Sequence, residues 1–207
     1  MPTQLDAILI VEFHDENLSR KDWLGGTRGP ALNGVWRWID ANHRFNSMLW
    51  DEEDRARRLD VGPADIAASK RLIDRHNQLR NDAVEAIDEA ILAQLAEVRH
   101  DDTARLSSET AGAMIDRLSI LALKIFHMRQ QTRRPDASTA HIDTCRAKLQ
   151  RLTAQRNDLA CCLDQLLIDA QGGHAYFKVY RQFKMYNDPT LNPYLYATAA
   201  SASGSAQ

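Results

Sequence analysis

Residues 64–99 read ADIAASKRLIDRHNQLRNDAVEAIDEAILAQLAEVR, without a glycine or a proline. Most of their apolar side chains recur at the spacing of one helix face. This apolar stripe consists of Ile66, Ile73, Val84, Ile87, Ile91, Leu95 and Val98. Pro63, directly before the run, suits the first turn of a helix. We therefore predict one long helix over 64–99, around which the rest of the chain is built.

Four further segments carry the same spacing, and glycine or proline marks most of the junctions between them. We predict helices over 4–18, 33–59, 108–131 and 139–170, and a short aromatic and basic helix over 175–186. Only nine Gly and six Pro occur in 207 residues, which is too few turn residues for a fold of many strands. We expect an all-α fold, an up-and-down bundle of five or six helices with long central helices. A single helical domain over 1–196 would then precede a disordered Ala/Ser-rich tail over 197–207.

Composition and charge exclude several classes of protein. The chain has 26 Lys and Arg against 28 Asp and Glu, so no global field attracts nucleic acid. No window holds about 18 uncharged apolar residues, so we expect no membrane span. The acidic first segment does not resemble a secretion signal. The cysteine count is three, an odd number that fits a reducing compartment better than a disulfide framework. We expect a soluble cytoplasmic protein.

Polar residues occupy positions where helical spacing calls for apolar ones. Asp74, Asn77 and Asn81 share one face of the long helix, because they stand three and seven residues apart. We name these residues, their flanking cations and the polar residues of 108–131 the polar seam. The polar seam consists of Lys70, Asp74, Asn77, Arg80, Asn81, Asp116, Arg117 and Lys124.

Burying a charge costs several kcal/mol unless it is paired and hydrogen-bonded. The polar seam is therefore a structural network that fixes helix register, the lining of a ligand pocket, or a surface exposed at a partner interface. In the same region, Trp50 precedes an acidic and basic run in which Glu53 and Arg57 are spaced for an ion pair. That run is either solvated helix surface or, with Trp50, a platform on which a sugar ring stacks.

The aromatic and basic segment at 175–186 has two interpretations. Arg181 and Lys184 lie among Tyr180, Phe183 and Tyr186. The rings can dock on the bundle while the cations reach solvent. Alternatively, the two cations form the mouth of a site that grips a phosphate or carboxylate.

Motifs for metals and cofactors are absent or incomplete. A di-iron bundle needs two Glu-x-x-His motifs and two further glutamates. The chain offers only Glu97 with His100, beside Asp40 with His43. Arg71 and His76 have the spacing of one class of helical ribonucleases, but they point to different sides of a helix. Hydrolase, P-loop and dinucleotide signatures are missing. We predict no metal and no cofactor.

Four motifs in order carry a family resemblance: 46–57 (NSMLWDEEDRAR), 70–82 (KRLIDRHNQLRND), 109–121 (ETAGAMIDRLSIL) and 180–188 (YRQFKMYND). Together they resemble a bacterial family known as domain of unknown function four-two-five-four, over roughly His43 to Tyr196. The resemblance implies a bacterial setting, with genes that tend to lie among those for lipopolysaccharide or other surface glycans. A phosphorylated or nucleotide-linked sugar would suit a pocket that has both cations and carboxylates.

Three hypotheses for function follow. The first is an accessory or binding protein of surface-glycan biosynthesis that holds an anionic sugar or phosphate-bearing ligand. The second is an enzyme on such a substrate, with Asp74, Asp116 or Glu53 as acid or base. The third is a scaffold for a glycosyltransferase, and a second copy of the chain is another partner that the sequence allows. The predicted ligand-binding residues are Trp50, Lys70, Asn77, Arg80, Asn81, Arg117, Lys124, Arg181 and Lys184.

Overall fold

The computed structural model describes residues 5–25, 32–182, 185 and 188–196. Its elements are α1 (Ala7–Ser19), α2 (Trp36–Arg55), α3 (Pro63–Gln94), β1 (Arg105–Leu106), α4 (Ala111–Gln131), α5 (Thr139–Gln171) and β2 (Ala175–Tyr176). A single helical turn follows at 193–196. The all-α bundle with long central helices is confirmed. The predicted tail, 197–207, lies outside the described residues.

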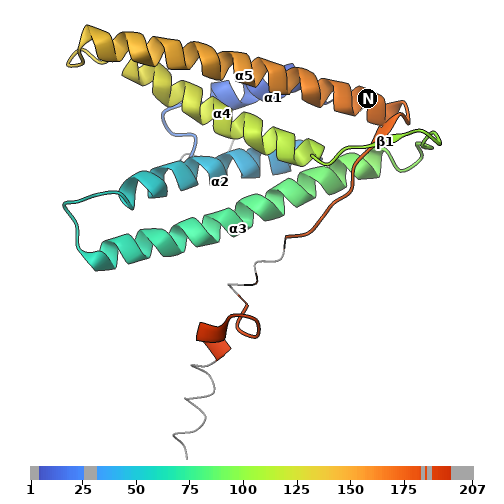
Figure 1. Cartoon of the computed structure of the whole chain (residues 1–207), viewed down its shortest axis with the longest axis horizontal. Helices are drawn as coiled ribbons and strands as arrows, with labels where there is room; N and C mark the ends of the chain where they lie inside the picture. The colour runs from blue at the N-terminus through green and yellow to red at the C-terminus, as the bar shows by residue number, and fades with distance from the viewer. Residues whose placement is uncertain (1–4, 26–31, 183–184, 186–187, 197–207) are drawn as a thin grey trace, which may run out of the picture.

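The five helices form two hairpins and one covering helix (Figure 1). Helices α2 and α3 run antiparallel as one hairpin, and α4 and α5 form the other. Helix α3 packs on α4 between the hairpins, and the short α1 packs on α4 and α5. Residues distant in sequence therefore meet along α4, which contacts every other helix.

The core lies where the two hairpins and α1 converge. Its fully buried large apolar residues are Ile10, Ile39, Ile87, Ile115, Leu118, Ile125 and Leu163. Burial of each such side chain contributes about 1.5–3 kcal/mol of hydrophobic stabilisation. Every helix supplies at least one of them, so the core joins all five helices into one unit.

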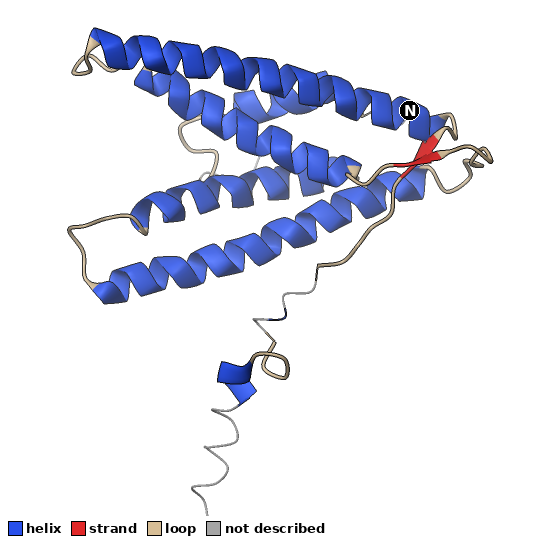
Figure 2. Ribbon diagram, in the orientation of Figure 1, coloured by secondary structure: helices blue, strands red, loops and turns tan. Residues whose placement is uncertain are grey.

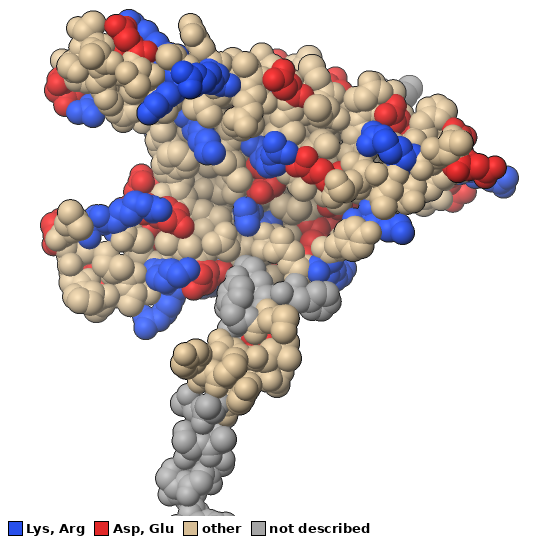
Figure 3. All heavy atoms as spheres, viewed as in Figure 1, with Lys and Arg blue, Asp and Glu red and all other residues tan. Residues whose placement is uncertain are grey.

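The hairpins are joined at one end by a short ladder of strands (Figure 2). β1 and β2 pair in parallel, and the backbone N–H groups of Arg105 and Ser107 donate to the carbonyls of His174 and Tyr176 at 2.9 and 2.8 Å. At the opposite end, the α2–α3 loop and the α4–α5 loop stand apart. Figure 3 shows a notch in the surface between these loops, with Lys and Arg atoms on both sides of it.

The predicted helix over 175–186 is wrong over 175–182, where the chain is extended. Gly173, at φ +78°, ends the turn after α5, and residues 175–176 then form β2. Burial alternates along Ala175, Tyr176, Phe177 and Lys178, which is the period of an extended chain rather than of a helix. Phe183, Lys184 and Tyr186 from this prediction lie outside the described residues.

Two predicted helix ends also extended too far. Helix α2 ends at Arg55 rather than at residue 59, and α3 ends at Gln94 rather than at residue 99. Residues 95–99 retain apolar side chains at helical spacing, but the chain must leave the helix there to reach β1 and close the ladder.

Candidate functional site

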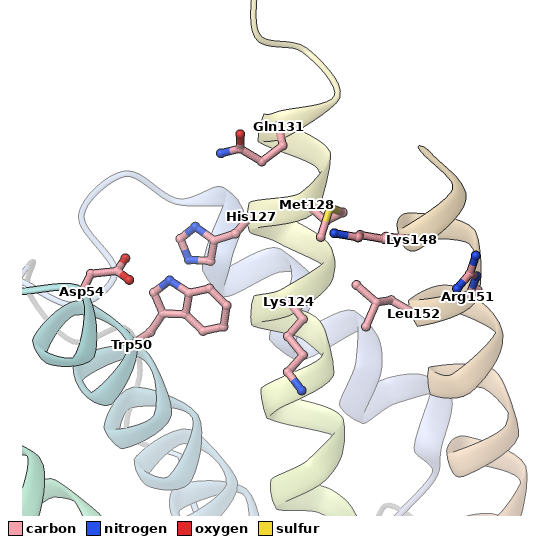
Figure 4. A pocket seen from close by; sticks show the side chains of 9 residues that line it. All are labelled: Trp50, Asp54, Lys124, His127, Met128, Gln131, Lys148, Arg151 and Leu152. Carbon is pink, nitrogen blue, oxygen red and sulfur yellow. The ribbon is translucent and has the colours of Figure 1, made fainter. Parts of the chain in front are cut away.

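A pocket of about 550 Å³ opens between the two hairpins at their separated end (Figure 4). We name it the inter-hairpin pocket. It is lined by Trp50 and Asp54 from α2, by Lys124, His127, Met128 and Gln131 from α4, and by Lys148, Arg151 and Leu152 from α5. Its size is that of a small-molecule site.

Helical spacing explains how each wall of this pocket is built. Lys124, His127 and Gln131 lie at positions i, i+3 and i+7 of α4, so they share one face. Trp50 and Asp54 lie four residues apart near the end of α2. Three helices thus each present one short polar stripe to a common space.

An aromatic pair forms the centre of the pocket. The Trp50 and His127 rings are parallel within 1°, with centroids 4.5 Å apart. Burial lowers the pKa of His127 below its usual 6.5, and the nearby Asp54 and Asp51 only partly oppose this effect. The imidazole is therefore neutral at pH 7. The pair is a flat, uncharged surface that joins α2 to α4.

Three cations line the same pocket as this aromatic pair. Lys124, Lys148 and Arg151 line the pocket, and within the described part of the chain none of them forms an ion pair. In Figure 4, Lys148 extends from α5 toward α4. The pocket has one carboxylate, Asp54, on the α2 side. Three cations against one carboxylate make the pocket attractive to an anion.

A second pocket of about 370 Å³ is lined by residues of α2, α3 and α4, and we name it the α3-side pocket. It shares Trp50 and Asp54 with the inter-hairpin pocket. Its other lining residues are Asn46, Leu49, Glu53, Arg57, Asn77, Arg80, Ile120 and Leu123. Glu53 pairs with Arg57 at 2.6 Å in a largely exposed ion pair.

At the centre of the polar seam, neighbouring donors satisfy the Asp116 carboxylate, while the buried Arg80 Nε has no hydrogen-bond partner among the described residues. Asp116 accepts hydrogen bonds from Asn42 and Asn46, both at 2.8 Å, and from Arg80 at 3.3 Å. Asn46 also donates to Ser119 at 3.0 Å. These bonds link α2, α3 and α4, so at Asp116 the seam fixes helix register.

The structure places the other predicted residues on separate surfaces. Lys70 and Asp74 form an exposed ion pair at 2.6 Å, and Arg117 pairs with Glu109 at 2.6 Å. Neither pair lines a pocket described above.

Arg181, in the last segment, also lies away from these pockets. Arg181 pairs with Glu85 at 2.8 Å and with Glu89, both on α3. Beside it, the Asn81 amide donates to Gln182 at 2.7 Å. Lys184 lies outside the described residues.

The structure thus divides the predicted site. Trp50 and Lys124 meet in the inter-hairpin pocket, whereas Glu53, Asn77 and Arg80 line the α3-side pocket with Trp50. Sequence reasoning missed His127, Lys148 and Arg151. A signal was present, because Lys148, Arg151 and Leu152 share one face of α5. The sequence does not show that this face meets Trp50.

The described residues contain no candidate metal site and no candidate membrane-spanning helix. Among them, no three His, Cys, Asp or Glu side chains are grouped so that they could hold a metal ion. No helix of the described chain combines the length and apolar character that crossing a bilayer requires.

The fold and this site define an all-α protein of two helical hairpins with paired pockets between them. The chain belongs to the family DUF4254, described as a protein of unknown function, whose model matches residues 36–179. That match begins at the first residue of α2 and ends just beyond β2, so it includes both hairpins and both pockets. No curated protein and no solved structure matches the chain.

Proposed function

We propose that the protein binds an anionic sugar or another phosphate-bearing ligand in the inter-hairpin pocket. The observation that carries this proposal is a pocket lined by the neutral Trp50–His127 pair and by three cations that have no ion-pair partner among the described residues. Charge-assisted hydrogen bonds from lysine and arginine to phosphate are among the stronger polar contacts in proteins. The aromatic pair and Leu152 add apolar surface for the rest of the ligand.

The setting that we propose is the bacterial cytoplasm, where the protein serves surface-glycan biosynthesis as an accessory or binding protein. This setting rests on the family resemblance, which implies genes that lie among those for lipopolysaccharide and other surface glycans. Intermediates of such pathways carry phosphate or a nucleotide, which matches the charge of the pocket.

Binding is better supported than catalysis. A general base needs a carboxylate that is free to take a proton next to the reacting atom. Asp116 is held by three donors, Asp74 is paired with Lys70, and Glu53 is paired with Arg57. Asp54 remains the one carboxylate of the inter-hairpin pocket, and an enzyme acting there would depend on it.

The test is calorimetric titration of the purified full chain with inorganic phosphate, hexose 1-phosphates and nucleotide sugars. We expect binding to at least one of these anions, and about a tenfold or greater loss of affinity in the double variant Lys148→Ala/Arg151→Ala, because both removed cations line the pocket. Arg129→Ala on α4 is the control, since it removes an exposed cation that does not line the pocket. Equal losses in both variants, or no binding by any anion, would contradict the proposal and favour a scaffold for a glycosyltransferase.

A further inference from the structure

The two pockets are neighbours. Trp50 and Asp54 line both of them, so α2 forms a shared wall between the pockets. Their volumes are about 550 and 370 Å³. A phosphate group alone would leave most of this space to water, whereas a ligand of two linked parts would fill it.

The α3-side pocket differs from its neighbour in charge. Two carboxylates, Glu53 and Asp54, stand against two guanidinium groups, Arg57 and Arg80. The excess of cations that marks the inter-hairpin pocket is absent from this lining. The balance of charge selects an uncharged group rather than a second phosphate.

Hydrogen-bonding groups in this pocket suit hydroxyls. A hydroxyl both donates and accepts, so it is best bound where amides, carboxylates and guanidinium groups stand together. The Asn77 amide lines the pocket and has no hydrogen-bond partner among the described residues. Glu53 uses Oε2 to bind Arg57, and that exposed pair is weak enough to rearrange around a ligand.

Apolar side chains complete the pocket. Leu49, Ile120 and Leu123 lie beside the Trp50 indole. The C–H face of a pyranose ring packs on such a surface while its rim of hydroxyls reaches the polar groups. One face of Trp50 is already covered by His127, which leaves the other for a ligand.

We infer that the ligand is a glycosyl phosphate whose phosphate lies in the inter-hairpin pocket and whose sugar ring lies in the α3-side pocket. This inference rests on the proposed function and narrows its ligand class. Asn77 and Glu53 then select the sugar, while Lys124, Lys148 and Arg151 bind the phosphate.

The experiment compares inorganic phosphate, a panel of hexose 1-phosphates, methyl glucoside and uridine diphosphate as titrants of the full chain. We expect at least one hexose 1-phosphate to bind tenfold or more tighter than inorganic phosphate. Asn77→Leu should lower the affinity for that hexose 1-phosphate about three- to tenfold, because one or two hydrogen bonds are lost. It should leave the affinity for inorganic phosphate unchanged, whereas Lys148→Ala/Arg151→Ala should weaken both.

Glu53→Gln is the second variant, because it keeps the size of a side chain that is 45% exposed and removes only its charge. Glu53→Gln should likewise weaken binding of that hexose 1-phosphate and leave the affinity for inorganic phosphate unchanged. Equal affinities for inorganic phosphate and every hexose 1-phosphate, or tighter binding of uridine diphosphate, would overturn the inference and leave anion binding intact. If no anion binds, the result would instead contradict the proposed function itself.

Discussion

Individual polar residues inside this bundle fall into two groups. Asp116 represents the first, because donors from α2 and α3 satisfy its carboxylate. His14 represents the second, since it is fully buried and neither ring nitrogen has a partner among the described residues. Its ring stacks on His43, with centroids 4.3 Å apart. The two groups respond differently to mutation and to pH.

Asp116→Ala should destabilise the protein by about 2–4 kcal/mol, because it leaves Arg80 and two amides without their acceptor in a largely buried position. Urea unfolding followed by circular dichroism measures the change. Asp74→Ala is the matched control, and its loss should stay within about 0.5 kcal/mol, since Asp74 belongs to an exposed ion pair. Similar losses for the two variants would show that the Asp116 network does not fix the helices.

The buried histidines make folding sensitive to acid. Burial lowers the pKa of His43 from 6.5 to about 3, and burial with the neighbouring His43 and Arg156 lowers the pKa of His14 well below 6.5. Below pH 6.5 the unfolded chain binds two protons that the folded chain does not. Each histidine should therefore reduce the free energy of unfolding by up to about 1.4 kcal/mol per pH unit as pH falls from 6.5.

The Asp88 carboxyl partly opposes this loss of stability in acid. Burial raises the pKa of its carboxyl from 3.8 to about 6, so its stabilising contribution is complete below pH 3.8 and is lost as pH rises through 6. Between pH 6 and 4 the unfolded chain binds two more protons on the histidines, whereas the folded chain binds one more on Asp88. The unfolded chain therefore binds one more proton in total, and acid lowers stability.

Urea unfolding at a series of pH values should show that the free energy of unfolding falls as the pH falls. In His14→Leu, the difference in bound protons that sets the slope of the free energy of unfolding against pH should decrease by about one. An unchanged slope in that variant would mean that His14 is not buried as a neutral group.

At the scale of elements, α3 and α4 approach each other closely at Gly112. A Cβ at this position would lie 2.5 Å from the Val84 carbonyl oxygen and 2.9 Å from the Asp88 carboxyl. The Gly112 backbone N–H donates to Asp88 at 2.6 Å. The absence of a side chain therefore lets the first turn of α4 lie directly on α3.

Gly112→Ala should cost about 1–3 kcal/mol, because the two helices must separate to admit the methyl group. Thermal unfolding measures the loss, and Gly25→Ala serves as the control, since a Cβ there meets nothing within 4 Å. Destabilisation of both variants to the same degree would indicate a general effect of replacing glycine rather than crowding between α3 and α4.

The elements were predictable to the extent that they depend on local pattern. All five helices lie where apolar spacing placed them, and α4 and α5 end within a residue of the predicted ends. The segment after Gly173 was not predictable in this way, because Tyr176 and Tyr180 satisfy helical spacing as well as alternation. Pairing with Arg105 and Leu106, some seventy residues earlier, decides in favour of the strand.

The whole molecule is closed at the β1–β2 end and open at the other. The inter-hairpin pocket lies toward the open end, and its lining comes from α2, α4 and α5. A ligand that contacts all three helices would hold the hairpins together. At 100 times its dissociation constant such a ligand adds about 2.7 kcal/mol to the free energy of unfolding.

Hydrogen exchange should reveal where the ligand acts. In the presence of a binding hexose 1-phosphate, we expect slower exchange in peptides covering 124–134 and 139–152, at the open end, because the ligand suppresses separation of the hairpins. Peptides covering β1 and β2 provide the internal control and should change little. Protection confined to the strands would contradict a ligand between the hairpins.

The sequence by itself determined the class of fold, the number of long helices and the residues that share a face within each helix. These properties depend on neighbours three or four residues apart and on glycine and proline. Only the tertiary structure decided that Asp116 is satisfied internally, that Asn77 faces a pocket, and that Lys148 and Arg151 join Trp50. The physical reason is that helical spacing orients side chains around one axis, whereas the packing of α2, α4 and α5 decides which faces meet.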